Sequence, residues 1–184
     1  MPLYVKDRYI PNFLLNNPLR STLYRRGKIL ARFSEVVHQG DTVLDEGAGP
    51  GFFTKSLLEL VGQNGLVYAV DPNPTSMYSL KKIQAQNLRV FLGSAGNLHF
   101  LRDGEIDFVF SNLVLCCMGD PLSGMKEISR VVKVGGHVYA SISKGPFGMG
   151  ELNQAAWRKF LGSFELLQSG GGLTEEWALL KKLG

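Results

Sequence analysis

The chain has 184 residues, of which 45% are hydrophobic and 20% are charged, and its formal net charge is +4. This length suits one globular domain with a sizeable core and is too short for two ordinary domains. No apolar run approaches the roughly 20 residues that a membrane span needs, and the N-terminus lacks the apolar core of a signal peptide, so we expect a soluble, cytoplasmic protein.

Residues 1–40 carry seven Lys or Arg side chains against two acidic ones, whereas the remainder of the chain is nearly neutral. Apolar residues recur at about helical spacing from 19 to 38 and predict a helix with a basic outer face, ended by Gln39 and Gly40. Most charge runs of this kind are solvated helix faces, but the field of such a segment also attracts nucleic acid, anionic lipid or an acidic substrate. We interpret residues 1–40 as an N-terminal helical arm on a globular unit of residues 41–184.

Short apolar runs then alternate with amphipathic ones. The pattern predicts strands over 42–45, 66–70, 88–92, 106–110 and 137–141, with helices over 52–61, 75–86 and 123–132 between them. The tail adds a helix over 152–161 and two strands, 164–168 and 176–181, joined by a glycine-rich loop. Fully apolar strands separated by helices imply a parallel sheet covered on both faces. The predicted fold is therefore α/β, with a Rossmann-like, seven-stranded, mostly parallel sheet and a closing antiparallel hairpin.

A glycine-rich segment follows the first predicted strand. Residues 45–51 read Asp-Glu-Gly-Ala-Gly-Pro-Gly, and glycines at alternate positions permit a tight turn and a close approach of the backbone to a ligand. The dinucleotide fingerprint needs another glycine where this chain has Phe52, and the Gly-Lys-Ser/Thr of a P-loop is missing. The segment therefore suits a ligand without phosphate, and Asp45 is suited to hold the ammonium end of a zwitterion.

Asp71 ends the second predicted strand, about 20 residues after the glycine loop, where a carboxylate can accept hydrogen bonds from both hydroxyls of a ribose. A helix cap or a turn before Pro72 is the structural alternative. The third strand ends at Ser94 and Ala95, which suit an adenine edge, and the fourth ends at 111–113, which suits the reacting end of a ligand.

These segments, taken together, resemble the class I S-adenosylmethionine-dependent methyltransferases, in the group related to ubiquinone and menaquinone biosynthesis (methyltransferase type 11). The resemblance runs from about residue 19 to the end, and its motifs occur in the family's order at 43–52, 67–71, 93–98, 106–112 and 127–136. Ser94 stands where the family commonly has an Asp that contacts the adenine amino group, and Val134 replaces the usual proline before the double glycine.

The resemblance implies an enzyme that uses S-adenosyl-L-methionine as its cofactor. The predicted cofactor-binding residues are Asp45, Glu46, Gly47, Ala48, Gly49, Gly51, Asp71, Pro72, Ser94, Ala95, Asn112 and Leu113. No catalytic residue is assigned, because a positioned sulfonium already carries much of the driving force for methyl transfer. We expect a small-molecule acceptor. The aromatic and basic residues of the N-terminal arm are compatible with a lid over that acceptor, and the alternative is that the arm packs on the sheet edge.

Two other hypotheses stay open. The basic arm is also compatible with an RNA-directed methyltransferase, and the intact motifs are compatible with a cofactor-binding protein without catalytic activity. The sequence does not indicate an oligomeric state.

The remaining reactive side chains show no metal-binding or catalytic pattern. Cys116 and Cys117 are adjacent and are expected to be free thiols in a reducing compartment. Because His38, His99 and His137 lack ligand spacing, no metal site is predicted. Neither His99 nor His137 is assigned as a general base, because His137 begins a predicted strand away from the expected active face and His99 is expected to be a loop residue.

Overall fold

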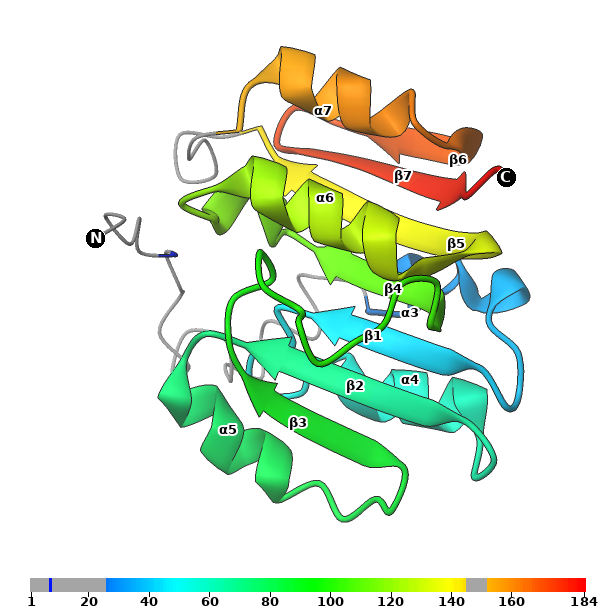
Figure 1. Cartoon of the computed structure of the whole chain (residues 1–184), viewed down its shortest axis with the longest axis vertical. Coiled ribbons are helices and arrows are strands. Elements are labelled where there is room, and N and C mark those ends of the chain that lie inside the picture. The colour runs from blue at the N-terminus through cyan, green and yellow to red at the C-terminus, as the bar shows by residue number, and fades with distance from the viewer. Residues whose placement is uncertain (1–6, 8–25, 145–151) are drawn as a thin grey trace.

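The computed structural model describes residue 7, residues 26–144 and residues 152–184. One seven-stranded sheet forms its centre, in the order β3-β2-β1-β4-β5-β7-β6 (Figure 1). The strands are β1 (Thr42–Glu46), β2 (Leu66–Asp71), β3 (Leu88–Leu92), β4 (Ile106–Asn112), β5 (Val132–Ser143), β6 (Glu165–Gly171) and β7 (Glu175–Lys181). β1 to β5 are parallel, whereas β7 pairs antiparallel with both β5 and β6. The predicted fold class is confirmed.

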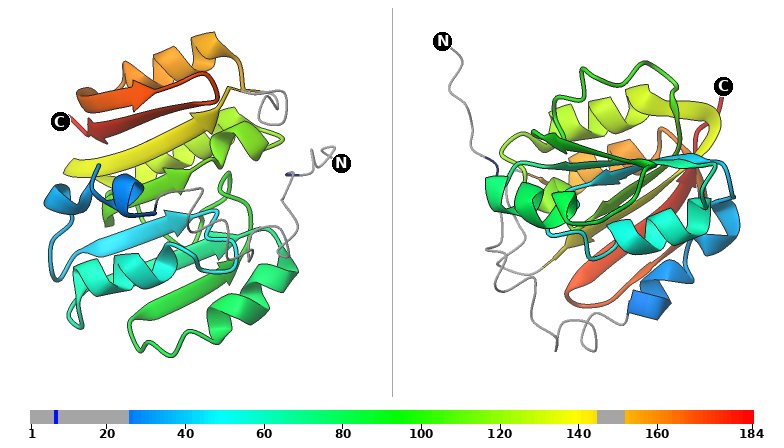
Figure 2. Two further views of the ribbon diagram at one scale, coloured as in Figure 1. Left: turned by 180° about the vertical axis from the view of Figure 1, so that it is seen from behind. Right: turned by 90° about the horizontal axis from the view of Figure 1, so that it is seen from below.

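Helices cover both faces of this sheet (Figure 2). The α-helices are α3 (Arg26–Leu30), α4 (Thr54–Val61), α5 (Pro74–Lys81), α6 (Pro121–Val131) and α7 (Gln154–Leu161), and the 3-10 helices are η1 (Ser34–Val36) and η2 (Leu115–Cys117). No helix among these is long and apolar enough to cross a bilayer.

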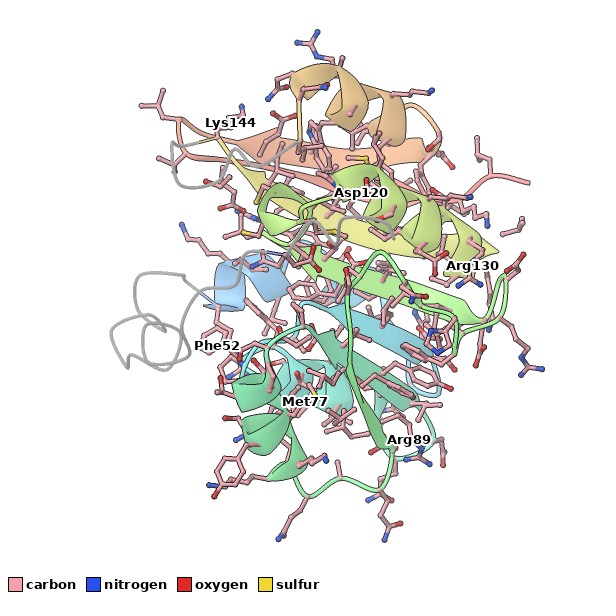
Figure 3. The ribbon with its side chains drawn as sticks, turned by 60° about the vertical axis from the view of Figure 1, so that its left-hand side comes forward. Phe52, Met77, Arg89, Asp120, Arg130 and Lys144 are labelled. Atoms are coloured by element: carbon pink, nitrogen blue, oxygen red, sulfur yellow. The ribbon has the colours of Figure 1, made fainter. Side chains whose placement is uncertain are left out.

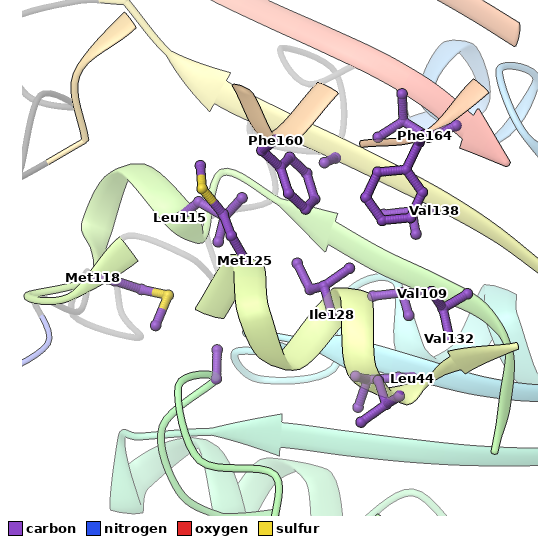
Figure 4. Packing of buried hydrophobic residues seen from close by; sticks show 14 of the residues in the cluster. Leu44, Val109, Leu115, Met118, Met125, Ile128, Val132, Val138, Phe160 and Phe164 are labelled. Carbon is purple, nitrogen blue, oxygen red and sulfur yellow. The ribbon is translucent and has the colours of Figure 1, made fainter. Parts of the chain in front are cut away.

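Successive strand residues point to opposite faces, which divides the core into layers. In β1, Leu44 faces the layer of α6 and α7, where Val109, Ile128, Val138 and Phe160 are buried around it (Figure 4). Val43 faces the layer of α3 and α4, with Phe33, Leu57 and Phe108. Burial on both faces explains why the central strands are almost wholly apolar in sequence.

The helix predicted over 19–38 is wrong at its C-terminal end; residues 19–25 lie outside the described residues. α3 ends at Leu30, and the chain continues in tight turns through η1. This break places Phe33 against the sheet, with its ring centroid 5.0 Å from that of Phe108. Ile29, Phe33 and Val37 are all buried, so this part of the arm is packed on the sheet.

Two further boundaries differ from the prediction. α5 stops at Lys81 instead of continuing to residue 86, because Lys82 and Ile83 donate to carbonyls three residues back and the chain turns. That turn brings Ile83 beside Gly51 of the glycine loop. β5 begins at Val132, where the sequence pattern predicted the end of a helix.

Candidate functional site

The glycine loop joins β1 to α4 at the carboxyl edge of the sheet. Gly47, Gly49 and Gly51 have φ angles of 67°, 55° and 92°, a region that side-chain-bearing residues rarely occupy. A Cβ on Gly47 would lie 2.4 Å from Cγ2 of Val114. The amide of Ala48 donates to the carbonyl of Val70 at 3.0 Å, which ties the loop to the end of β2. These glycines are therefore required by backbone conformation and, at Gly47, by packing.

Asp71 fixes the loop from the neighbouring strand. Its Oδ2 accepts a hydrogen bond of 2.7 Å from the amide of Gly49, and its Oδ1 accepts one of 2.9 Å from the amide of Asn73. A carboxylate has about four lone-pair positions, so both oxygens keep capacity for outside donors such as ribose hydroxyls. Asp71 is only 7% exposed and its hydrogen bonds hold it rigidly, which fits the predicted ribose-binding role. The helix-cap alternative is wrong, because Asn73 caps α5, but the bond from the Asn73 amide shows that Asp71 also stabilises the turn at Pro72.

A cleft of about 350 Å³, including its open mouth, lies beside the glycine loop. Its polar side chains are Asp45 and Asn112, and three aromatic rings complete the wall. The lining residues are Asp45, Gly47, Ala48, Gly49, Pro50, Phe52, Phe53, Phe110 and Asn112. A concave site that combines aromatic walls with a few placed polar groups can hold a small molecule.

Asp45 is held within this cleft by the first turn of α4, where the Thr54 hydroxyl donates to Oδ2 at 2.5 Å. Burial raises the pKa of Asp45 to about 7; the Thr54 hydrogen bond opposes the rise and the nearby Asp71 charge adds to it. An ammonium group placed here would favour the ionised carboxylate. The residues present thus fit a zwitterionic ligand.

The end of β4 forms the other side of the cleft. The Ser141 hydroxyl donates to Oδ1 of Asn112 at 3.0 Å. The amide of Leu113 donates to the carbonyl of Ser141, at 3.1 Å. Leu113 has a φ of 60°, and among the described residues it is the only one other than glycine with a positive φ. Such strain persists where surrounding contacts enforce it and is common at functional sites.

Glu46 is one of the predicted cofactor-binding residues that do not line the cleft. It pairs in register with Val70 and Ser111 and points to the face opposite Asp45. Both of its carboxyl oxygens and the Ser111 hydroxyl are buried without a hydrogen-bond partner among the described residues. Burial raises the pKa of Glu46 to about 8, a rise that the nearby Ser111 hydroxyl opposes. At neutral pH this side chain is mainly a neutral acid.

The other predicted residues surround the edge of the site. Pro72 follows β2 directly. The amide of Gly93 donates to the carbonyl of Asp71 at 3.1 Å, which places the turn with Ser94 next to β2. Ala95 packs into the core and is 4% exposed. Contact of these residues with a ligand stays a prediction.

The sequence reading missed the wall of the cleft. The sequence pattern places Phe53 in a predicted helix and Phe110 in a predicted strand, and it gives neither residue nor Thr54 a role in the site. A hydroxyl in the first turn of a helix that follows a buried Asp is a signal that could have identified Thr54. Figure 3 shows Phe52 close to α3, and Phe52 also belongs to the cleft lining. Neither His99 nor His137 lines the cleft.

In the part of the chain that the structure describes, neither Cys116 nor Cys117 forms a disulfide bond. Within the described ranges, no three His, Cys, Asp or Glu side chains converge as a metal site requires.

A family model described as "Methyltransferase domain" (type 11) matches residues 44–140, just over half of the chain. The chain belongs to this family of class I S-adenosylmethionine-dependent methyltransferases. The predicted family and cofactor are thereby confirmed, and S-adenosyl-L-methionine is the cofactor of this methyltransferase domain.

Related proteins agree with this assignment. Human thiol S-methyltransferase TMT1A is 32% identical over 201 residues, which cover 97% of this chain and 76% of that protein. Demethylmenaquinone methyltransferase of Geobacillus is 33% identical over 106 residues, which cover 55% of this chain and 45% of that protein. The crystal structure of a SAM-dependent methyltransferase from Aquifex aeolicus has a similar fold, with a TM-score of 0.75 at 23% identity, covering 94% of this chain and 100% of that one. The methyltransferase chain spans about half the length of several curated relatives that it matches.

Proposed function

We propose that this methyltransferase transfers the methyl group of S-adenosylmethionine to a small acceptor, and that the acceptor is a thiol. The main support for methyl transfer is the cleft between the ends of β1 and β4, where the glycine loop, Asp45 and Asn112 meet. Asp71 lies beside it, bonded to Gly49 of the same loop. In parallel α/β sheets, ligands bind at this carboxyl edge.

Residues of the cleft and Asp71 beside it have different roles in holding the cofactor. Asp71 would accept from the ribose hydroxyls, and Asp45 would face the ammonium group of the methionine part. When bound, the cofactor supplies an electrophilic methyl group on a sulfonium centre. The protein's own contribution is to orient the reactants and exclude water, and the rigid Asn112–Leu113 turn suits that purpose.

The absence of a histidine from the described cleft favours a thiol acceptor. Among the described lining residues, Asp45 is the only titratable side chain, and its proposed partner is the ammonium group of the cofactor. A thiol has a pKa of about 8.5, so part of it is ionised near neutral pH without a strong base, whereas an alcohol needs one. TMT1A, 32% identical to this chain, is named as a thiol S-methyltransferase.

Two arginines of the basic arm argue against the RNA-directed alternative, because their side chains contact the domain. Arg26 lies over the Phe52 ring and bonds to Ser56, and Arg32 forms an ion pair with Glu175 at 3.1 Å. Both guanidinium groups are therefore engaged with the domain, although Lys28 is exposed. The other basic residues of the arm lie outside the described residues.

Cofactor binding is tested by calorimetric titration of the wild type, Asp71→Ala and the exposed control Glu59→Ala with S-adenosylmethionine. Charge-assisted hydrogen bonds predict an affinity loss of roughly 10- to 100-fold for Asp71→Ala and none for Glu59→Ala. Failure of the wild type to bind would reject the proposal, as would equal binding by Asp71→Ala.

Acceptor chemistry is tested by measuring S-adenosylhomocysteine formation with matched small thiols, alcohols and amines and, separately, with RNA. We expect turnover with thiols, rising with pH as the thiol ionises. Turnover restricted to alcohols or amines contradicts the thiol assignment. Cofactor binding without turnover on any acceptor, including RNA, supports the non-catalytic alternative, and turnover on RNA alone supports the RNA-directed one.

A further inference from the structure

The two cysteines of the chain are adjacent in η2, the turn that follows β4 at the carboxyl edge of the sheet. The amide of Cys117 donates to the carbonyl of Val114 at 2.7 Å, which closes the turn. On either side of the pair, Leu115 and Met118 are buried in the core (Figure 4). These contacts fix the backbone that carries both thiols.

The two sulfur atoms are in hydrogen-bond contact with each other. The thiol of Cys117 donates to the sulfur of Cys116, and the amide of Ser143, at the end of β5, donates to the same sulfur at 3.4 Å. The bond from Cys117, with a smaller effect of the Ser143 amide, lowers the pKa of Cys116 to about 7, although burial acts in the opposite direction. Because the thiolate is the form that binds ligands, Cys116 is partly in its reactive state near neutral pH.

The chemistry of the pair restricts what it can hold. Cys116 is 3% exposed, whereas Cys117 is half-buried, so a ligand reaches the sulfur atoms from the Cys117 side. Zinc takes four ligands, and in the described ranges no third His, Cys, Asp or Glu side chain completes a metal cluster. A linear copper(I) dithiolate needs its sulfur atoms on opposite sides of the metal, which a contacting pair does not offer. Trivalent arsenic that carries one organic group has two remaining positions on the same side, and a soft centre of this kind prefers thiolates.

We propose that Cys116 and Cys117 together bind thiophilic trivalent arsenicals of the type R–As(OH)2 as a two-sulfur site. Two As–S bonds replace two As–O bonds, and each thiol proton leaves with a hydroxyl group as water. Arsenic stays trivalent, so the step needs no oxidant or reductant. This site goes beyond the proposed methyl transfer and does not depend on it.

Titration of the reduced, folded protein with phenylarsine oxide tests the site, since this compound forms R–As(OH)2 in water. Intact mass should show one arsenical per chain, and a thiol-reactive dye should show that both thiols are lost together. Because the second As–S bond forms within the same molecule, the wild type should bind roughly 100- to 10,000-fold more tightly than Cys116→Ser or Cys117→Ser. Either variant alone suffices for this comparison if the other does not fold.

Release experiments and a matched control distinguish a two-sulfur site from reaction at one thiol. The wild-type adduct should withstand excess glutathione and be released by 2,3-dimercaptopropanol, whereas glutathione should release the adduct of each serine variant. Met118→Leu removes the neighbouring thioether, keeps a buried apolar side chain and should behave as wild type. Equal affinity of the wild type and the serine variants would overturn the assignment. Binding in urea but not to the folded protein would also overturn it, because the packed turn would then exclude the ligand.

Discussion

Glu46 offers a direct test of how burial controls ionisation in this sheet. Replacing it by glutamine keeps the shape of the side chain and removes its ionisable group. In the folded protein, burial raises the pKa of Glu46 from an ordinary 4.5 to about 8. The native state therefore holds a proton that the unfolded state releases between these pH values. The stability that Glu46 contributes is fully present below pH 4.5, declines as the pH rises, and is gone above pH 8.

The size of the effect follows from the two pKa values. A difference of about 3.5 corresponds to about 5 kcal/mol at 1.36 kcal/mol per pKa unit, and local relaxation and water entry lower this to about 2 to 5 kcal/mol. Near pH 5, Glu46→Gln and the wild type should have similar free energies of unfolding. At pH 8 to 9, the free energy of unfolding of Glu46→Gln should be higher by about 2 to 5 kcal/mol. Asp45 titrates in both proteins, and its charge is one of the causes that raise the pKa of Glu46, so the measured difference includes this coupling between the two carboxyl groups.

Urea unfolding at pH 5, 6, 7, 8 and 9, followed by tryptophan fluorescence at constant ionic strength, measures this difference. Glu59→Gln, the same change at an exposed position of α4, should parallel the wild type at every pH. Parallel curves for Glu46→Gln and wild type would show that the Glu46 carboxyl is solvated or paired, and would refute the reasoning.

Three other predictions concern the site and its supports. Gly47→Ala should lower the free energy of unfolding by about 2 kcal/mol, because φ is 67° and the new Cβ meets Val114; adding Val114→Ala should recover part of the loss in thermal denaturation. Affinity for S-adenosylmethionine should rise as the pH passes through about 7 and Asp45 ionises, whereas affinity for 5′-methylthioadenosine, which lacks the ammonium, should stay flat; two equally steep calorimetric profiles would exclude Asp45 as the cause. Arg130 donates to the carbonyls of Leu98 and Leu101, so Arg130→Ala should cost about 2 kcal/mol in urea unfolding, and an unchanged midpoint would show that these bonds contribute little.

The sequence by itself determined the features that depend on local backbone conformation and on periodicity. The strand and helix alternation follows from apolar spacing, and the glycine loop follows from positions where φ is positive. The position of Asp71 near the glycine loop was predictable from the sequence, because the carboxyl ends of parallel strands converge at one edge of the sheet. Each of these signals lies within a few residues of the feature that it predicts.

Only the tertiary structure decided how distant groups act on one another. Gly49 and Asp71 are bonded across 22 positions of sequence, and Phe33 ends the predicted helix early because its ring stacks on the sheet. The raised pKa values of Asp45 and Glu46 arise from complete burial, which the layers above each face of β1 create. Burial and long-range contact depend on the packed fold, so no local pattern in the sequence encodes them separately.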